Sequence, residues 1–224
     1  MDIAIITLYM VVLTILGIYG FHRAHLIFLF WKHRNKVTVP PTEFTDLPQI
    51  TVQLPMYNEM YVAERLLESV AKLDYPLDRL ELQVLDDSTD ETRDIARRKC
   101  EELRARGIDV SYLHRTDRTG YKAGALEAGM KVSKGEFLMV FDADFLPTPG
   151  IIKQLIHHFT DAKVGMVQGR WGHINRDYSL LTRMQSMMLD GHFVIEHIAR
   201  NRSGRFFNFN GTAGMWRKTA IIDA

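Results

Sequence analysis

The stretch Phe137-Leu138-Met139-Val140-Phe141-Asp142-Ala143-Asp144 decides the fold. Its apolar part predicts a buried strand, and two carboxylates one residue apart follow where that strand ends. Since open α/β sheets bind ligands at the carboxyl ends of their strands, this position favours a ligand site. Mg²⁺ and Mn²⁺ prefer oxygen ligands, typically one or two carboxylates together with substrate phosphates. We expect Asp142 and Asp144 to hold such an ion against a diphosphate, whereas an isolated pair of this kind more often lies solvated in a loop.

Strands and helices alternate on both sides of this stretch. The hydrophobic pattern predicts strands over residues 50–54, 81–85, 110–113, 137–141 and 164–167. It predicts helices over 59–73, from 88 to about 106, over 120–132, from 149 onward and over 179–200, and Ser88 and Glu91 suit a capping box for the second of them. This alternation is typical of an α/β fold with a doubly wound, mostly parallel sheet.

The N-terminal segment has a different character. Residues 3–21 carry no charged side chain and would span roughly 28 Å as a helix, close to the hydrocarbon thickness of a bilayer. A signal peptide is disfavoured, because Asp2 follows Met1 and no small-residue cleavage pattern follows. We expect a transmembrane anchor over 1–31, a proline-containing linker over 32–48 and a globular domain over 49–224. The basic residues after the span place that domain in the cytoplasm.

The composition excludes some classes of protein. A hydrophobic content of 46% and a charged content of 25% are those of a folded domain, and a net charge of +1 gives no basic bias toward nucleic acid. Cys100 is the single cysteine, so disulfides within the chain are excluded. The histidines show no metal-ligand spacing and are interpreted as structural.

Further polar motifs follow the predicted strands. Tyr57 and Glu59 follow the first strand and could stack on and bond a nucleobase, although a plain turn explains them equally well. The pair Asp86 and Asp87 follows the second strand and could accept hydrogen bonds from a base or a ribose. Lys122 opens a helix between glycines, where a phosphate would bind. The aromatic and amide residues of 206–214 suit sugar rings and hydroxyls, or an ordinary strand and turn.

Taken in order, these segments resemble a family 2 glycosyltransferase. The matching strings are QLPMYNE (53–59), VLDDSTDET (84–92), GYKAGAL (120–126), FDADF (141–145), VQGRW (167–171) and FFNFNGTAG (206–214). Together they resemble cellulose-synthase-like mannan and glucan synthases, including their bacterial relatives. The resemblance covers about residues 49–224. It implies a Rossmann-like GT-A fold and inverting transfer of a hexose from a nucleotide-sugar to a growing β-glycan at the cytoplasmic membrane face.

The resemblance also implies roles for individual residues. The nucleotide would be held by Pro55, Tyr57, Glu59, Asp86, Asp87, Lys122 and Asp142. The metal, Mg²⁺ or Mn²⁺, would be bound by Asp142 and Asp144, and the acceptor end would be lined by Asn210, Gly211 and Thr212. The implied partners are a glycan acceptor, a lipid bilayer and a donor that is GDP-mannose, GDP-glucose or UDP-glucose, with no nucleic acid.

The resemblance departs from the family at the end of the chain. Family members carry a later acidic motif whose Asp serves as the general base, and it would lie beyond Ala224. The sequence therefore predicts a domain truncated at its C-terminal end, inactive by itself, with a nucleotide-sugar-binding module without turnover as the alternative. A haloacid-dehalogenase-like phosphatase is disfavoured, because its D-x-D motif normally lies near the start of the domain. For the apolar stripe on the last predicted helix, core packing is favoured over a membrane surface; the stripe is Met184, Met187, Met188, Phe193, Ile195 and Ile198.

Overall fold

A computed structural model describes residues 3–223, so Met1 and Asp2 of the predicted anchor and Ala224 of the predicted domain lie outside the described residues. Contacts divide the chain into two compact units. The first contains the residues up to Thr38 together with Arg170–Asn208, and the second contains Val39–Gly169 and the residues from Phe209 onward. Residues 170–208 therefore group with the predicted anchor, whereas the sequence placed them in the globular domain. The boundaries at 31 and 48 stay predictions.

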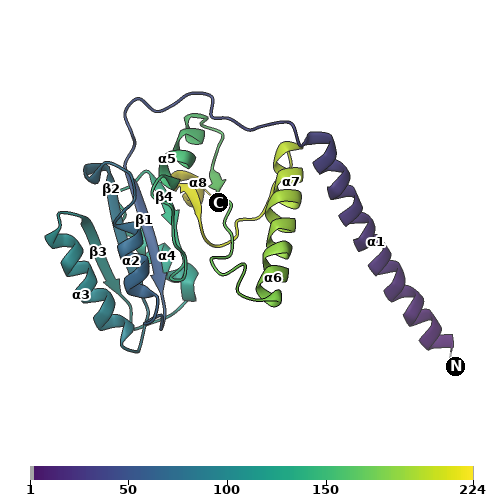
Figure 1. Ribbon diagram of the computed structural model, residues 1–224, viewed down its shortest axis with the longest axis horizontal. Helices are drawn as coiled ribbons and strands as arrows, with labels where there is room; N and C mark the ends of the chain where they lie inside the picture. Colours follow the sequence, from purple (N-terminus) through teal and green to yellow (C-terminus); the bar gives the residue numbers. More distant parts are fainter. Residues whose placement is uncertain (1–2, 224) are drawn as a thin grey trace. The chain divides into compact units, whose positions relative to one another are not determined.

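The second unit is built on a six-stranded mixed sheet (Figure 1). Its strands are β1 (Ile50–Met56), β2 (Leu80–Asp86), β3 (Asp109–His114), β4 (Phe137–Val140), β5 (Met166–Gln168) and β6 (Gly214–Arg217). They lie in the order β3-β2-β1-β4-β6-β5. The pairs within β3-β2-β1-β4 are parallel, whereas β6 runs antiparallel to both β4 and β5. The predicted α/β class with a mostly parallel sheet is confirmed, and β6 was not predicted.

Helices connect the strands, as the alternation predicts. They are α2 (Ala63–Val70), α3 (Thr92–Ala105), α4 (Tyr121–Val132), α5 (Ile151–Ile156) and α8 (Lys218–Ile222), with short 3₁₀ turns at Leu77–Arg79 (η1) and His157–Thr160 (η2). The predicted capping box is wrong. Helix α3 begins four residues after Ser88 and has no side-chain cap, because the Ser88 hydroxyl instead accepts a hydrogen bond from Asn58 N at 2.9 Å.

The core of the second unit lies along the parallel strands. Every residue of β1, β2 and β4 is buried, as expected of strands covered on both faces. The core includes a polar layer, because Thr51 pairs with Glu81 and Gln53 with Gln83 across β1 and β2. The Thr51 hydroxyl donates to Glu81 Oε2 at 2.6 Å, and Gln53 Nε2 donates to Gln83 Oε1 at 3.2 Å. These buried polar groups are therefore satisfied within the sheet.

The first unit contains the long helix α1 (Ile3–His33) and a second helical segment. That segment is α6 (Leu180–Asp190), a π-helical turn at Gly191–His197 (η3) and α7 (Ile198–Arg202), which corresponds to the helix predicted over 179–200. Leu26 and Leu29 of α1 pack against Ala199 of α7. The most apolar window of α1 has a mean hydropathy of 2.3 and buries none of its residues, so α1 is long and apolar enough to cross a membrane.

The favoured core packing of the apolar stripe is wrong for its three methionines and is confirmed for Phe193. Met184, Met187 and Met188 are 55%, 68% and 78% exposed, whereas Phe193 is 4% exposed. The methionines of α6 are therefore exposed within their unit. The side chains of this helical segment become buried only where the segment approaches α1. The alternative, a membrane surface, stays a prediction.

Candidate functional site

Loops that follow β1 and β2 are bonded to each other at the carboxyl edge of the sheet. Asp87 N donates to the Met56 carbonyl at 3.0 Å, and Asn58 Oδ1 accepts from Thr89 N at 2.9 Å. Asn58 adopts a left-handed backbone conformation, with φ of 56°, which an asparagine tolerates better than most side chains. These contacts fix the end of β1 against the end of β2 and hold the side chains between them in place.

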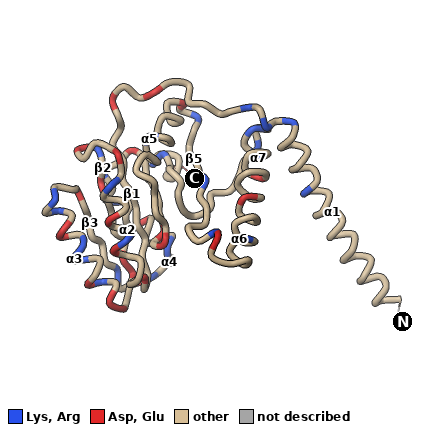
Figure 2. The backbone as a smooth tube through the Cα atoms, in the orientation of Figure 1, with Lys and Arg blue, Asp and Glu red and all other residues tan. Residues whose placement is uncertain are grey.

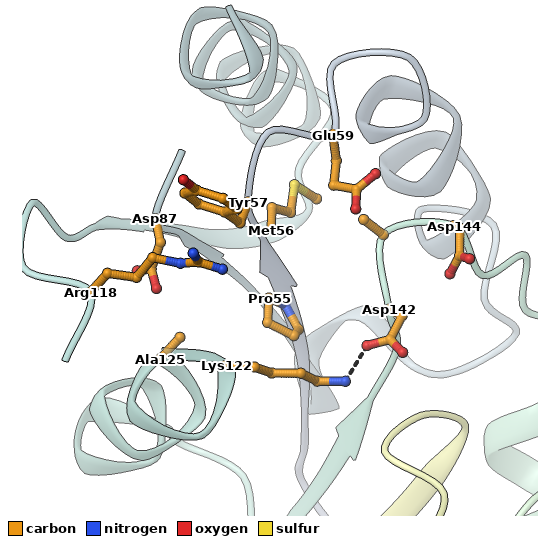
Figure 3. A pocket seen from close by; sticks show the side chains of 11 residues that line it. Pro55, Met56, Tyr57, Glu59, Asp87, Arg118, Lys122, Ala125, Asp142 and Asp144 are labelled. Atoms are coloured by element: carbon orange, nitrogen blue, oxygen red, sulfur yellow. Dashed lines mark hydrogen bonds and ion pairs between the residues drawn. The ribbon is translucent and has the colours of Figure 1, made fainter. Parts of the chain in front are cut away.

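A pocket of about 370 Å³ opens at this edge, within the second unit (Figure 3). Two sides of the pocket differ in character. Tyr57, Asp87 and Arg118 lie on one side, and Glu59, Asp142 and Asp144 lie on the other, with Lys122 reaching between them from α4. The full lining is Pro55, Met56, Tyr57, Glu59, Asp87, Arg118, Lys122, Ala125, Asp142, Ala143 and Asp144. Residues predicted from four separate motifs thus meet in one cavity.

Carboxylates concentrate on one side of the pocket. Burial raises the pKa of Glu59 above its ordinary 4.5, and the negative charges of Asp144, Asp142 and Asp90 raise it further. Among residues 3–223 no cluster of three or more His, Cys, Asp or Glu side chains could hold a metal ion by itself. The two carboxylates of the D-x-D motif nevertheless fit a Mg²⁺ or Mn²⁺ ion that completes its shell with water and substrate phosphates. The repulsion on Glu59 is what a cation would relieve.

Lys122 connects the acidic side to the loop before β6. Its ammonium group forms an ion pair with Asp142 and donates to the Gly211 carbonyl at 2.8 Å. It lies in the first turn of α4, where the chain turns sharply at Gly120, with φ of 74°. The amino-terminal end of a helix favours anions, so α4 and Lys122 together suit a phosphate group.

The neighbouring acids Asp86 and Asp87 have different surroundings. Asp86 is fully buried, lies outside the pocket lining and accepts hydrogen bonds from Ser88 N at 2.8 Å and from the Tyr112 hydroxyl at 2.6 Å. Burial and this bond raise the pKa of Tyr112. Asp87 lines the pocket. Its two carboxylate oxygens accept hydrogen bonds from Arg115, from Nε at 2.8 Å and from Nη2 at 2.5 Å. Asp87 therefore lines the pocket, whereas Asp86 supports the loop beneath it.

Arg118 lies in the pocket and was not predicted. Its guanidinium carbon lies 3.2 Å from the centre of the Tyr57 ring and 5.2 Å from that of Tyr121. Within residues 3–223 it makes no ion pair, and its Nε is buried without a hydrogen-bond partner. The sequence did offer a signal for this residue. Arg118 stands four residues before Lys122, beside a motif that was predicted to bind phosphate.

The predicted acceptor residues adjoin the same pocket. Asn210 N donates to Gln168 Oε1 at 3.1 Å, and Thr212 Oγ1 accepts from Asp142 N at 2.9 Å. Together with the bond from Lys122 to Gly211, these contacts place residues 210–212 next to the D-x-D motif. The structure thus brings together the residues predicted to line the acceptor and those predicted to bind the metal.

Two further titratable side chains, His197 and Cys100, have the properties of structural residues. Burial, followed by the neighbouring charge of His192, lowers the pKa of His197 to about 4, so this ring is neutral at physiological pH. Burial raises the pKa of Cys100 to about 11, which leaves an unreactive thiol.

Comparison with known sequences identifies relatives of the whole globular part. The sequence profile described as Glycosyl transferase family 2 matches residues 51–223. Glucomannan 4-beta-mannosyltransferase 2 of Arabidopsis thaliana is 40% identical over 211 residues, which are 89% of this chain and 40% of that protein. Glucomannan 4-beta-mannosyltransferase 1 of Oryza sativa subsp. japonica is 42% identical over 190 residues, which are 83% and 36%. The chain therefore spans about two fifths of the length of these relatives.

Comparison with solved structures supports the fold. The mannosyltransferase PcManGT from Pyrobaculum calidifontis, solved with GDP-Man and Mn²⁺, superposes with a TM-score of 0.69 at 24% identity. The match covers 90% of this chain and 55% of that one. S. aureus TarS in complex with UDP-GlcNAc superposes with a TM-score of 0.52 at 20% identity and covers 78% of this chain and 47% of its own. These likenesses confirm the fold that the sequence resemblance implied.

Proposed function

Because the chain belongs to glycosyl transferase family 2, we propose that it transfers a mannosyl residue from GDP-mannose to a growing β-glycan, with inversion, at the cytoplasmic face of a membrane. One observation carries this proposal. A single pocket combines an aromatic and basic side, an acidic side and a lysine between them, in the order that a base, a diphosphate and a sugar would need (Figure 3). The mannosyltransferase names of the relatives support the choice of sugar.

Tyr57 and Asp87 would bind the nucleoside. The Tyr57 ring, 38% exposed, offers a face on which a base can stack. Asp87 is oriented by Arg115, so its position is fixed before the ligand arrives. Asp86 would contribute through the loop that it supports, and Pro55 would shape the floor of the pocket. Preorganised contacts of this kind reduce the ordering cost of binding.

Lys122 and the acidic side would act on the diphosphate. As the donor bond breaks, negative charge grows on the leaving nucleoside diphosphate, and a fixed ammonium group stabilises that charge in the transition state. Lys122 would exchange its bond to Asp142 for one to the phosphate. Asp142 and Asp144 would hold Mg²⁺ or Mn²⁺, which offsets the same charge when bound. The PcManGT complex contains Mn²⁺, which supports a divalent ion here.

The loop at Asn210, Gly211 and Thr212 would receive the acceptor. It bonds directly to both Lys122 and Asp142, so an acceptor hydroxyl placed there lies beside the leaving group. Transfer also requires a base within hydrogen-bond reach of that hydroxyl. Binding and transfer are therefore tested separately.

The binding test is calorimetry of the chain with GDP and UDP, with Mn²⁺ or with a chelator. We expect GDP to bind, and we expect its affinity to fall when Mn²⁺ is chelated and in Asp142→Asn and Asp144→Asn. Asp78→Asn, an exposed carboxylate on η1 outside the pocket, is the matched control. Equal affinity with chelator and in both pocket variants would contradict the assignment of the metal residues.

The transfer test is a donor screen in membranes that contain the protein. Labelled GDP-mannose, GDP-glucose and UDP-glucose are supplied with Mg²⁺ or Mn²⁺, and the product is digested with a β-mannanase. Product from GDP-mannose alone supports the proposal, and product from a glucose donor corrects the sugar. Nucleotide binding without transfer favours the binding-module alternative.

A further inference from the structure

Basic side chains from two distant segments meet where α1 ends, within the first unit. Lys32, Arg34 and Lys36 follow the apolar part of α1, whereas Arg202 is the last residue of α7 and Arg205 lies in the turn that follows it. Figure 2 shows Lys and Arg gathered where α1 and α7 lie side by side. We call these five residues the basic cluster.

Specific contacts hold the basic cluster together. The Arg202 guanidinium donates to the Arg34 carbonyl, and the Thr38 hydroxyl donates to Asn201 Oδ1 at 3.1 Å. The charge of Arg205 acts on His33 together with those of Lys32 and Lys36, so Arg205 belongs to the same cluster. The cluster is therefore a product of the fold, since Arg202 follows Arg34 by more than half of the chain.

Within residues 3–223, no carboxylate neutralises the basic cluster. Among the residues that the structure describes, none of its five members forms an ion pair with an acidic side chain. Glu196, the carboxylate of the η3 turn, is paired with Arg23 at 3.0 Å and with Arg200 at 3.1 Å. Arg34 instead stacks over the Trp31 ring at 4.0 Å. Like charges held together without counter-charges repel one another, which favours binding of an anion.

The place of the basic cluster identifies the kind of anion. Helix α1 is long and apolar enough to span a membrane, and the cluster lies at its C-terminal end, beside the exposed Trp31. Tryptophan and basic residues at the end of a span lie at the level of lipid headgroups. The orientation of the span by positive charge explains Lys32, Arg34 and Lys36. It does not explain why Arg202 and Arg205, at and just after the end of α7, join them. We propose that the basic cluster binds the phosphate groups of anionic phospholipids and thereby fastens α7 to the membrane surface at the end of α1.

The experiment measures retained lipid by native mass spectrometry of the chain in neutral detergent with phosphatidylglycerol or phosphatidylcholine. We expect preferential retention of phosphatidylglycerol, lost at high salt. Near an anionic surface each Lys or Arg contributes about fivefold in affinity, so Arg202→Gln/Arg205→Gln should weaken binding roughly 25-fold. Arg176→Gln/Arg183→Gln removes two arginines from exposed positions shortly before and within the first turns of α6, and this variant should bind as the wild type does.

A second variant protects the test from misfolding. Lys32→Gln/Lys36→Gln removes two side chains that donate no hydrogen bond in the described structure, and it should weaken retention to a similar degree. Equal retention of both lipids by the wild type would overturn the proposal, as would unchanged retention in both cluster variants. Inorganic phosphate and GDP are tested as competitors. Displacement of the lipid by either at concentrations similar to that of phosphatidylglycerol would assign the cluster to a small soluble anion and would equally overturn the proposal.

Discussion

Glu59 and Arg118 carry opposite charges at the two sides of one pocket, and neither forms an ion pair within residues 3–223. Glu59 experiences the neighbouring carboxylates, and Arg118 is held over Tyr57 rather than by an acid. Charged side chains that are partly buried without an ion-pair partner lower the stability of the folded protein. Such arrangements are found mainly in active sites. The consequences can be measured one residue at a time.

Arg118→Ala should weaken the binding of a nucleoside diphosphate. The guanidinium stacks on aromatic rings and carries a positive charge, so it can contact either the base or the phosphates of the donor. We expect the dissociation constant of GDP to rise about tenfold, which corresponds to one stacking or charge-assisted contact. Calorimetry with GDP, guanosine and pyrophosphate distinguishes the two contacts. Arg97→Ala is the control, because Arg97 also lies over a tyrosine ring, that of Tyr112, but outside the pocket. Tighter GDP binding by Arg118→Ala would contradict the prediction and show that Arg118 only blocks the site.

Glu59→Gln should stabilise the protein at neutral pH in the absence of metal. Because burial and nearby carboxylates raise the pKa of Glu59 above 4.5, the folded protein holds this proton more tightly than the unfolded chain does. The contribution of this carboxyl to stability is thus fully present below 4.5 and is lost as the pH rises through the raised pKa. Thermal unfolding across this range should show a gain for Glu59→Gln that disappears at low pH. Glu101→Gln on α3 is the control, and a gain independent of pH would contradict the electrostatic cause.

At the scale of elements, the apolar pattern predicted β1 to β4 and α4 to within about two residues at each end. Strands β1, β2 and β4 are apolar runs buried along their whole length, and turn residues bound them in the sequence. Strand β6 was missed because it is short and follows a glycine-rich motif with no alternation of its own. The stripe of α6 was assigned to the core because periodicity shows that one face is apolar, but not what covers that face. Arg118 was missed although it stands four residues before Lys122, because its partner is the Tyr57 ring and a charge pattern does not indicate an aromatic partner.

Gly124→Ala should disturb the start of α4. A β-carbon at residue 124 would lie 2.1 Å from the Thr119 carbonyl oxygen, a backbone atom that cannot turn aside. The turn that places Lys122 would have to shift, and overpacking of this kind costs about 1–3 kcal/mol. We expect a lower unfolding temperature and weaker GDP binding. At Gly172 a β-carbon meets nothing within 4 Å, so Gly172→Ala should leave both unchanged. Equal effects of the two variants would refute this steric explanation.

At the scale of the whole molecule, the sequence predicted consecutive domains, whereas contacts group residues 170–208 with α1. Composition reveals a boundary only where a linker interrupts the chain, because the linker has a composition of its own. A contact between segments far apart in the sequence leaves no such mark. Helix α1 itself was predicted from its uncharged run. The pairing of its end with α7 depends on Leu26, Leu29 and Ala199, which look ordinary in the sequence.

The chain should behave as an integral membrane protein with its N-terminus outside. The apolar α1 is followed by basic residues, and these favour the cytoplasmic side. Alkaline carbonate should leave the chain in the membrane pellet, and a protease outside intact right-side-out vesicles should spare residues 49–223. A variant without α1 is the control for peripheral attachment. Release of the full chain by carbonate would contradict the span, and digestion from outside would contradict the orientation.

The position of β6 also sets the order in which the chain can acquire its structure during synthesis. Strands β2, β3 and β4 each pair with a strand that has already been made. Strand β5 does not, because β6 lies between it and β4 and leaves the ribosome only after the whole α6 segment. At about 5–20 residues per second, β5 waits for seconds with both edges exposed. Completion of the sheet, and with it the bond from Lys122 to the Gly211 carbonyl before β6, is therefore a late event, whereas the residues that line the pocket, from Pro55 to Asp144, have all been made by then.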